Sequence, residues 1–190
     1  MSESIDKFNA SPGDRKTQCA SGAVSRSCGR DMRLDSRTVQ GGGKTKAVCA
    51  KELFLSGCNC SQAVFCAFAG DYGFDADIAR KVSCGLGGGV GRMREVCGAV
   101  GGAALVFGLE YGEDKMRTYA EVQEFCASFK REAGSMICRE LLEGAHVTAE
   151  TGGTPEARTE SYYRKRPCAE LVELAAGILD GMLKKGKKEK

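Results

Sequence analysis

The chain has no tryptophan and only three prolines, and it contains a single histidine among its 190 residues. That histidine, His146, lies in a polar segment, so a Cys–His catalytic pair has no good candidate. No other set of side chains forms a recognisable acid–base pair, and an enzyme acting on an organic substrate is not supported. Whether the protein is an enzyme at all is therefore left undecided by the sequence.

Long apolar runs are also missing. No stretch of about 18 apolar residues occurs, which argues against a transmembrane helix. The first residues, MSESIDKF, are polar and no apolar signal segment follows, so we expect a cytoplasmic protein in a reducing compartment. Residues 44–183 carry sixteen basic and nineteen acidic side chains. A mildly acidic body of this kind is not expected to bind nucleic acid.

Cysteine is the residue that the chain has in excess, with eleven copies. Structural disulfides are rare in reducing compartments, so these cysteines are expected to be small core residues, metal or cluster ligands, or reactive thiols. Two of them, Cys19 and Cys28, lie in residues 1–43. This segment is rich in Ser, Gly, Arg and Asp and has no apolar periodicity, so we predict a disordered tail with two free thiols.

The rest of the chain has a helical pattern. Apolar residues recur at spacings of three and four, and no sustained alternation of period two occurs. We predict an all-α domain over residues 44–184, a single bundle of five or six short helices, followed by a basic tail at 185–190. Asn59 is expected to begin one helix. In a later helix, from 76 to about 83, Ile78 and Val82 are expected to face inward.

The most conspicuous stretch runs from Cys84 to Gly112 and combines glycines with a cysteine. Glycine inside a helix costs about 1 kcal/mol relative to Ala. The glycines in the helix expected at 95 to about 108 therefore suggest a close approach to another segment, either within the chain or in a second copy. The preceding glycine loop, residues 85–91, suits an anion-binding nest, but we favour a flexible wall for a cysteine site. Arg92 and Arg94 are either counter-charges for a thiolate or solvated.

Four cysteines share one physical situation: each lies in the first turn of an expected helix and on its apolar face. They are Cys60, Cys97, Cys138 and Cys168. The free N–H groups and partial positive charge of a helix start favour the thiolate, which is the metal ligand and the nucleophile. Four buried thiolates are tolerable only if a metal neutralises them. The alternative is that all four are packing residues. Cys58, next to the first of them, is either a further ligand or a spare thiol.

Several segments resemble the C_GCAxxG_C_C family, whose members are described as redox-active. They are the run Gly57-Cys58-Asn59-Cys60-Ser61-Gln62-Ala63-Val64, the loop Gly87-Gly88-Gly89, the run Cys97-Gly98-Ala99-Val100-Gly101-Gly102, the segment Cys138-Arg139-Glu140-Leu141-Leu142 and Pro167-Cys168. The resemblance covers about residues 44–184. It implies a small, mostly helical redox protein whose four pattern cysteines correspond to Cys60, Cys97, Cys138 and Cys168. The module is also similar to part of some multi-haem cytochromes in which cysteines hold an iron–sulfur centre, but no CxxCH haem motif occurs here.

The leading hypothesis is an electron-transfer protein whose four cysteines hold an iron–sulfur cluster, with zinc as the alternative. A second hypothesis is a thiol–disulfide protein or redox sensor that uses the same cysteines without metal. A third is a helical binding module in which the cysteines are only core residues. We expect a redox partner protein of unknown identity and neither nucleic acid nor membrane as a partner, and the sequence leaves a homodimer open.

Overall fold

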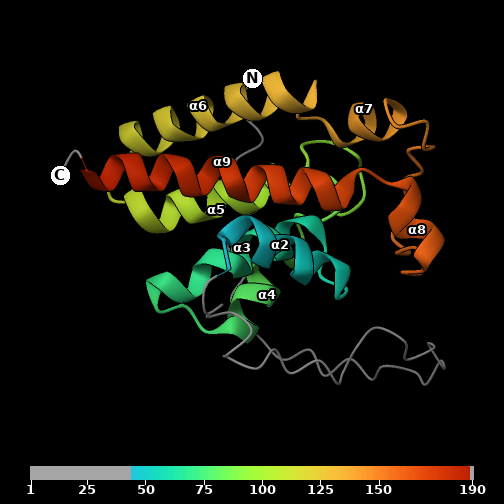
Figure 1. Ribbon diagram of the computed structural model, residues 1–190, viewed down its shortest axis with the longest axis horizontal. Coiled ribbons are helices and arrows are strands. Elements are labelled where there is room, and N and C mark those ends of the chain that lie inside the picture. Colours follow the sequence, from blue (N-terminus) through green and yellow to red (C-terminus); the bar gives the residue numbers. More distant parts are fainter. Residues whose placement is uncertain (1–43, 189–190) are drawn as a thin grey trace, which may run out of the picture. The chain divides into compact units, whose positions relative to one another are not determined.

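The structure is a computed structural model that describes residues 44–188, so the predicted disordered tail with Cys19 and Cys28 lies outside the described residues. Eight α-helices and a short 3-10 helix fill this range, and no strand occurs within it (Figure 1). The predicted all-α class is confirmed, but the predicted number of five or six helices is too low. No helix in the described part of the chain has the length and apolar character needed to cross a membrane.

The first helices begin where short polar side chains can cap them. Asn59 accepts from the Gln62 backbone N–H at 3.0 Å, and the Gln62 side chain accepts from the Asn59 N–H at 2.9 Å, which completes a capping box. Asp75 caps the next α-helix in the same region. The elements of this part are α2 (Lys46–Leu55), α3 (Cys60–Ala69), the 3-10 helix η1 (Gly70–Tyr72) and α4 (Ala76–Cys84).

The glycine-rich helix α5 (Gly98–Tyr111) packs against α3. A Cβ on Gly102 would lie 2.7 Å from the Ser61 carbonyl oxygen and 3.1 Å from the Val64 Cβ. Only a residue without a side chain allows the two helices to come this close. The predicted close approach is therefore confirmed, and it occurs within the chain.

The C-terminal half completes the bundle with α6 (Lys115–Ala133), α7 (Cys138–Glu143), α8 (Glu160–Lys165) and α9 (Cys168–Lys188). The long helix α9 packs against α2, α3, α5 and α6, and it continues into the segment predicted as a basic tail (Figure 1). The helix α8 was not predicted, because it is short and has no buried residue that would produce an apolar period.

The prediction for the inner face of α4 is wrong. Ile78 and Val82 are 49% and 53% exposed, whereas Ala79 and Ser83 are buried. This helix packs against α3, and the side that meets α3 carries small residues. The helical spacing of three and four residues was predicted correctly for α4. The larger apolar residues of this short helix, however, do not mark its buried side.

Candidate cysteine site

The four cysteines selected from the sequence lie where four helices begin. Cys60, Cys138 and Cys168 are the first residues of α3, α7 and α9, and Cys97 is the N-cap of α5. Helix α5 begins three residues later than predicted, so Cys97 precedes its first turn. All four cysteines line one small cavity of about 10 Å³, which is about the smallest that admits one water molecule. The other lining residues are Gly88, Gly98, Leu141, Leu142 and Leu171.

An isolated antiparallel bridge between Val96 and Ile137 brings two of these cysteines together. Each cysteine directly follows one residue of the bridge. The Cys97 N–H donates to the Met136 carbonyl at 2.8 Å, and the Cys138 N–H donates to the Glu95 carbonyl at 2.6 Å. Backbone hydrogen bonds alone therefore hold Cys97 and Cys138, which are distant in sequence, next to each other.

Glycine allows the backbone to approach the other side of the site. Gly89 has a φ of +70°, and a Cβ there would lie 2.7 Å from the Cys138 Cβ. A Cβ on Gly98 would lie 3.2 Å from the Cys60 Cβ. The glycine loop and the start of α5 therefore form walls of the cysteine site, as predicted.

The thiols of this site differ in acidity. Burial raises the pKa of Cys97 to about 12, although the N–H groups of Ala99 and Val100 partly oppose this. A hydrogen bond to Cys168, together with burial, raises the pKa of Cys60 well above its ordinary value. The pKa of Cys168 is lowered, first by the hydrogen bond from Cys60 and then by nearby guanidinium groups. Within the pair, Cys168 is therefore the thiol that loses its proton more readily.

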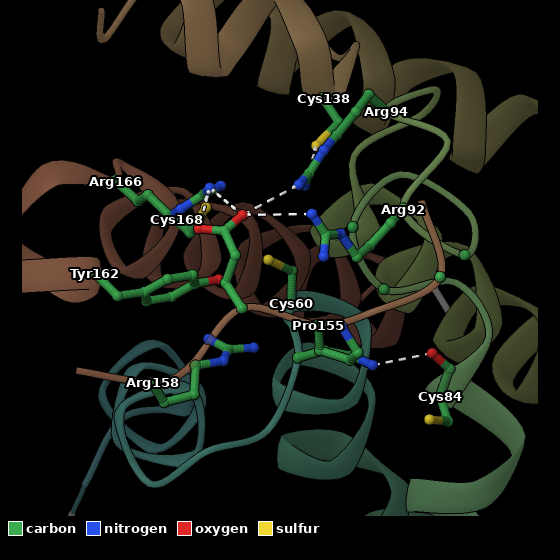
Figure 2. Close-up of a pocket in the computed structure, with 16 residues that line it drawn as sticks. Cys60, Cys84, Arg92, Arg94, Cys138, Pro155, Arg158, Tyr162, Arg166 and Cys168 are labelled. Carbon is green, nitrogen blue, oxygen red and sulfur yellow. Dashed lines mark hydrogen bonds and ion pairs between the residues drawn. The ribbon is translucent and has the colours of Figure 1, made fainter. Parts of the chain in front are cut away.

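Cys138 is intermediate between these cases. Burial raises its pKa, and Arg94 lowers it by hydrogen bonding and by charge. The Arg94 Nη1 donates to the Cys138 Sγ at 3.9 Å, and Arg94 is only 5% exposed (Figure 2). The sequence left open whether Arg94 faces solvent; it is buried beside sulfur. The helix start alone does not favour the thiolate at all four cysteines. Burial outweighs it at Cys97 and Cys138, and the hydrogen bond to Cys168 together with burial outweighs it at Cys60.

The remaining described cysteines do not line this cavity, although Cys84 lines a second pocket next to it. Cys49 and Cys66 are buried in the apolar core, Cys126 is half-buried, and Cys84 is exposed. Cys58 is half-buried, and its charge would act on Cys66, whose pKa burial raises to about 12. Cys58 does not line the cavity of the four cysteines.

The donor set suits a thiophilic metal, but the present thiol positions are not those of bound ligands. Within residues 44–188, no group of three or more His, Cys, Asp or Glu side chains is arranged to hold a metal ion. Four sulfurs around one cavity are nevertheless the donor set of iron–sulfur clusters and of structural zinc. A cysteine thiol moves to another staggered position by rotation about one bond, without a shift of the backbone. The residue types therefore match such a group, and holding it would require their thiols to turn toward it.

A family model with the description "Putative redox-active protein (C_GCAxxG_C_C)" matches residues 58–182, a range that includes all four cysteines. The chain belongs to the C_GCAxxG_C_C family. A search of curated proteins and a search of solved structures each gave no match. The description of the family supports redox activity, and the more specific chemistry has to be argued from the site.

This C_GCAxxG_C_C protein also carries site residues that the sequence analysis missed. An outer pocket of about 230 Å³ adjoins the cysteines and shares Cys60, Cys138 and Cys168 with the inner cavity (Figure 2). Arg158 and Arg166 line it together with Glu156. They come from the polar segment 145–166, which has no apolar period. The one local signal was the position of Arg166, two residues before Cys168.

Proposed function

We propose that the protein transfers electrons through an iron–sulfur cluster held by Cys60, Cys97, Cys138 and Cys168, with zinc as the alternative occupant. The observation that carries the proposal is the meeting of four helix starts, each with a cysteine, at one cavity. Sets of four cysteines hold [2Fe–2S] and [4Fe–4S] clusters and structural zinc. Membership of a family described as redox-active favours the cluster over zinc, which has no redox chemistry.

The surrounding residues suit this role. A bound cluster would supply one-electron storage. Leu141, Leu142 and Leu171 line the cavity and limit the access of water. The Arg94 guanidinium beside Cys138 offsets negative charge on sulfur. Hydrogen bonds and positive charge near ligand sulfurs favour the reduced state and raise the reduction potential.

The direct test is the metal content of the full chain purified without oxygen. We expect visible absorption that is bleached by dithionite, with iron and sulfide in stoichiometric amounts per chain. One zinc per chain, without colour, would support the alternative occupant and remove the electron-transfer role. A colourless and metal-free protein, also after reconstitution with iron and sulfide, would rule out both.

A second candidate function is thiol–disulfide exchange by Cys168 and Cys60. It is favoured by their hydrogen bond and by the lowered pKa of Cys168. The Cys168 thiolate would attack one sulfur of a disulfide substrate and release the other as a thiolate. The Cys60 sulfur, after losing its proton, would then displace the substrate from Cys168. The products are one protein disulfide and two substrate thiols, so the two electrons lost by the protein equal those gained by the substrate.

This candidate is tested on metal-free, reduced protein with glutathione disulfide as the oxidant. Thiol exchange predicts a Cys60–Cys168 disulfide in the wild type. In Cys60→Ser it predicts a stable mixed disulfide between Cys168 and glutathione, detected by peptide mass spectrometry. Cys126→Ser is the matched control and should still form the internal disulfide. Random mixed disulfides across the nine described cysteines would contradict a specific pair.

A further inference from the structure

The outer pocket beside the cysteines contains an excess of positive charge. Four arginines line it, and they come from separate parts of the chain (Figure 2). Arg92 and Arg94 follow the glycine loop, whereas Arg158 and Arg166 lie on either side of α8. Facing them is one carboxylate, that of Glu156. The pocket has a volume of about 230 Å³, which is larger than a small oxyanion needs.

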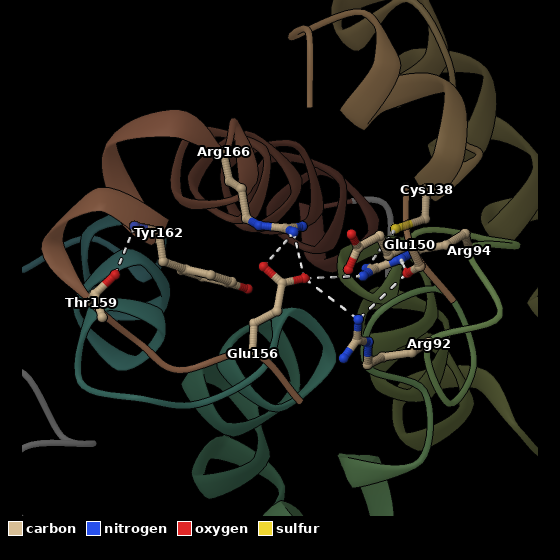
Figure 3. Close-up of polar contacts among 8 residues, drawn as sticks. All are labelled: Arg92, Arg94, Cys138, Glu150, Glu156, Thr159, Tyr162 and Arg166. Atoms are coloured by element: carbon tan, nitrogen blue, oxygen red, sulfur yellow. Dashed lines mark hydrogen bonds and ion pairs between the residues drawn. The ribbon is translucent and has the colours of Figure 1, made fainter. Parts of the chain in front are cut away.

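Glu156 is held in this pocket in the way that a bound carboxylate would be held. The Arg166 Nη2 lies 2.6 and 2.8 Å from its two oxygens. Arg92 and Arg94 lie 3.5 and 3.6 Å from the Oε1 atom (Figure 3). Two of these guanidinium groups are almost fully buried, since Arg94 is 5% and Arg166 is 7% exposed. Buried arginines with a carboxylate between them form a strong and geometrically specific site for oxyanions.

Glu156 itself is not fixed to the core. Its side chain is 36% exposed, and it lies in the irregular segment between α7 and α8. A carboxylate on such a loop can leave the pocket without unfolding a helix. Arg94 and Arg166 are more deeply buried than the carboxylate they contact.

One carboxylate does not satisfy the donors of this pocket. Among the described residues, the Arg92 Nε and the Arg158 Nη1 are buried and have no hydrogen-bond partner. The contacts of Arg158 are with aromatic rings: its guanidinium lies 4.9 Å from the centroid of Phe54 and 4.6 Å from that of Tyr162. Buried donors of a charged group that remain unpaired are costly, so the pocket has capacity for further oxygen acceptors.

The cysteines do not account for all of this charge. One arginine contacts sulfur, Arg94 at 3.9 Å from Cys138, whereas three contact the Glu156 carboxylate at shorter distances. The contacts are those of a site that recognises oxygen.

We propose that this pocket binds a small oxyanion with two negative charges, a dicarboxylate or a phosphate- or sulfate-like ion, and that Glu156 is the internal occupant which the ligand displaces. Four guanidinium charges opposite one carboxylate account for the preference for a dianion. The two unpaired donors supply hydrogen bonds that Glu156 does not use. The site lies directly outside Cys60, Cys138 and Cys168, so the bound anion sits next to the cysteine site.

The test is calorimetric titration of the full chain, as purified, in a buffer without polyvalent anions. Succinate, phosphate and sulfate are the separate probes, and acetate is the singly charged comparison. We expect one dianion to bind more tightly than acetate, and the best probe tells a dicarboxylate site from an inorganic oxyanion site. Glu156→Gln should bind that probe roughly tenfold more tightly, because the competing carboxylate is gone. Glu160→Gln, the same change on the exposed surface of α8, should not.

Removal of a donor gives the opposite result. Arg158→Gln should bind the best probe roughly tenfold more weakly than the wild type. Arg164→Gln, which removes the same charge from the exposed side of α8, should bind it as the wild type does. Because Arg158 also packs on aromatic rings, Arg92→Gln serves as a second removal variant if the first does not fold.

The proposal is overturned if neither the wild type nor Glu156→Gln binds any of the three dianions. It is equally overturned if the Arg158 and Arg164 variants lose the same affinity, since the effect would then be general charge attraction. Iron measured on the same samples keeps this question apart from the proposed cluster. If the affinity for the anion changes in a variant and its iron content stays the same, the anion site is separate from the cluster site. A chain without metal can still bind the anion.

Discussion

Cysteines of the apolar core and cysteines of the four-cysteine site can be compared through Cys66 and Cys168, whose pKa values shift in opposite directions. Cys66, in the interior of α3, is 2% exposed, and burial raises its pKa to about 12. Cys168, at the start of α9, has a lowered pKa because Cys60 donates to it and arginines lie nearby. The comparison teaches that burial alone does not decide what a cysteine can do. The groups that a thiol faces decide its acidity together with burial, because Cys97 also lies at a helix start and its pKa is raised to about 12 like that of Cys66.

The strongest test of this comparison is the exchange of one cysteine from each group for serine. Cys97→Ser should lose nearly all bound iron or zinc, because one of the four ligand sulfurs is gone. Cys126→Ser should keep the metal content of the wild type, since Cys126 does not line the cavity. The measurement is metal per chain after anaerobic purification. Equal loss in both variants would show that the two groups are not distinct.

Replacing one of two glycines by alanine tests how much the close approach of the glycine loop to the cysteine site contributes to stability. Gly89→Ala should destabilise the fold by roughly 1–3 kcal/mol, because the new Cβ meets Cys138 and the backbone is left-handed there. Gly85→Ala in the same turn should stay within about 0.5 kcal/mol of the wild type, since its φ is −65° and no atom lies within 4 Å of the added Cβ. Urea unfolding of metal-free protein measures both. A Gly89 variant as stable as the Gly85 variant would mean that the wall adapts freely.

The sequence predicts the local part of this site well. The start of α3 at Cys60 follows from the Asn59 cap, the places of Cys138 and Cys168 near helix starts follow from periodicity, and the close approach of α5 follows from its glycines. Local signals did not give the buried side of α4, where small residues meet α3 and Ile78 stays exposed. Which side of a helix is covered depends on its neighbours, and these are set by contacts between distant segments.

The arginines of the outer pocket could not be predicted from local sequence signals either. Arg92 and Arg166 are far apart in sequence, and each alone looks like an ordinary surface residue. Only the fold places both beside Glu156. The bridge between Val96 and Ile137 is equally invisible to pattern analysis, because a single pair of residues has no period.

The acidity of the core cysteines predicts a fall in stability at high pH. A folded-state pKa of about 12 for Cys66, against an ordinary value of 9.0, means that the folded protein holds this proton more firmly. That stabilisation is complete below pH 9 and is lost as the pH rises toward 12, by up to about 1.4 kcal/mol per pH unit. Urea unfolding of reduced protein at pH 8, 9 and 10 should therefore show a steeper fall for the wild type than for Cys66→Ala. Parallel curves would mean that the Cys66 proton is not held by burial.

The smallest effect on metal content and stability is expected for replacement of Cys58, which lies close to Cys60 in sequence but resembles the core cysteines. In sequence Cys58 is two residues from Cys60, but in space its neighbour is Cys66, and burial raises its pKa as it does for the core cysteines. Cys58→Ser should therefore leave metal content unchanged, with a change in unfolding free energy of no more than about 1 kcal/mol. The paired variant Cys60→Ser, measured on the same scale, should lose the metal. If Cys58→Ser lost metal as well, sequence proximity would outweigh helix position, and the ligand set would have to include Cys58.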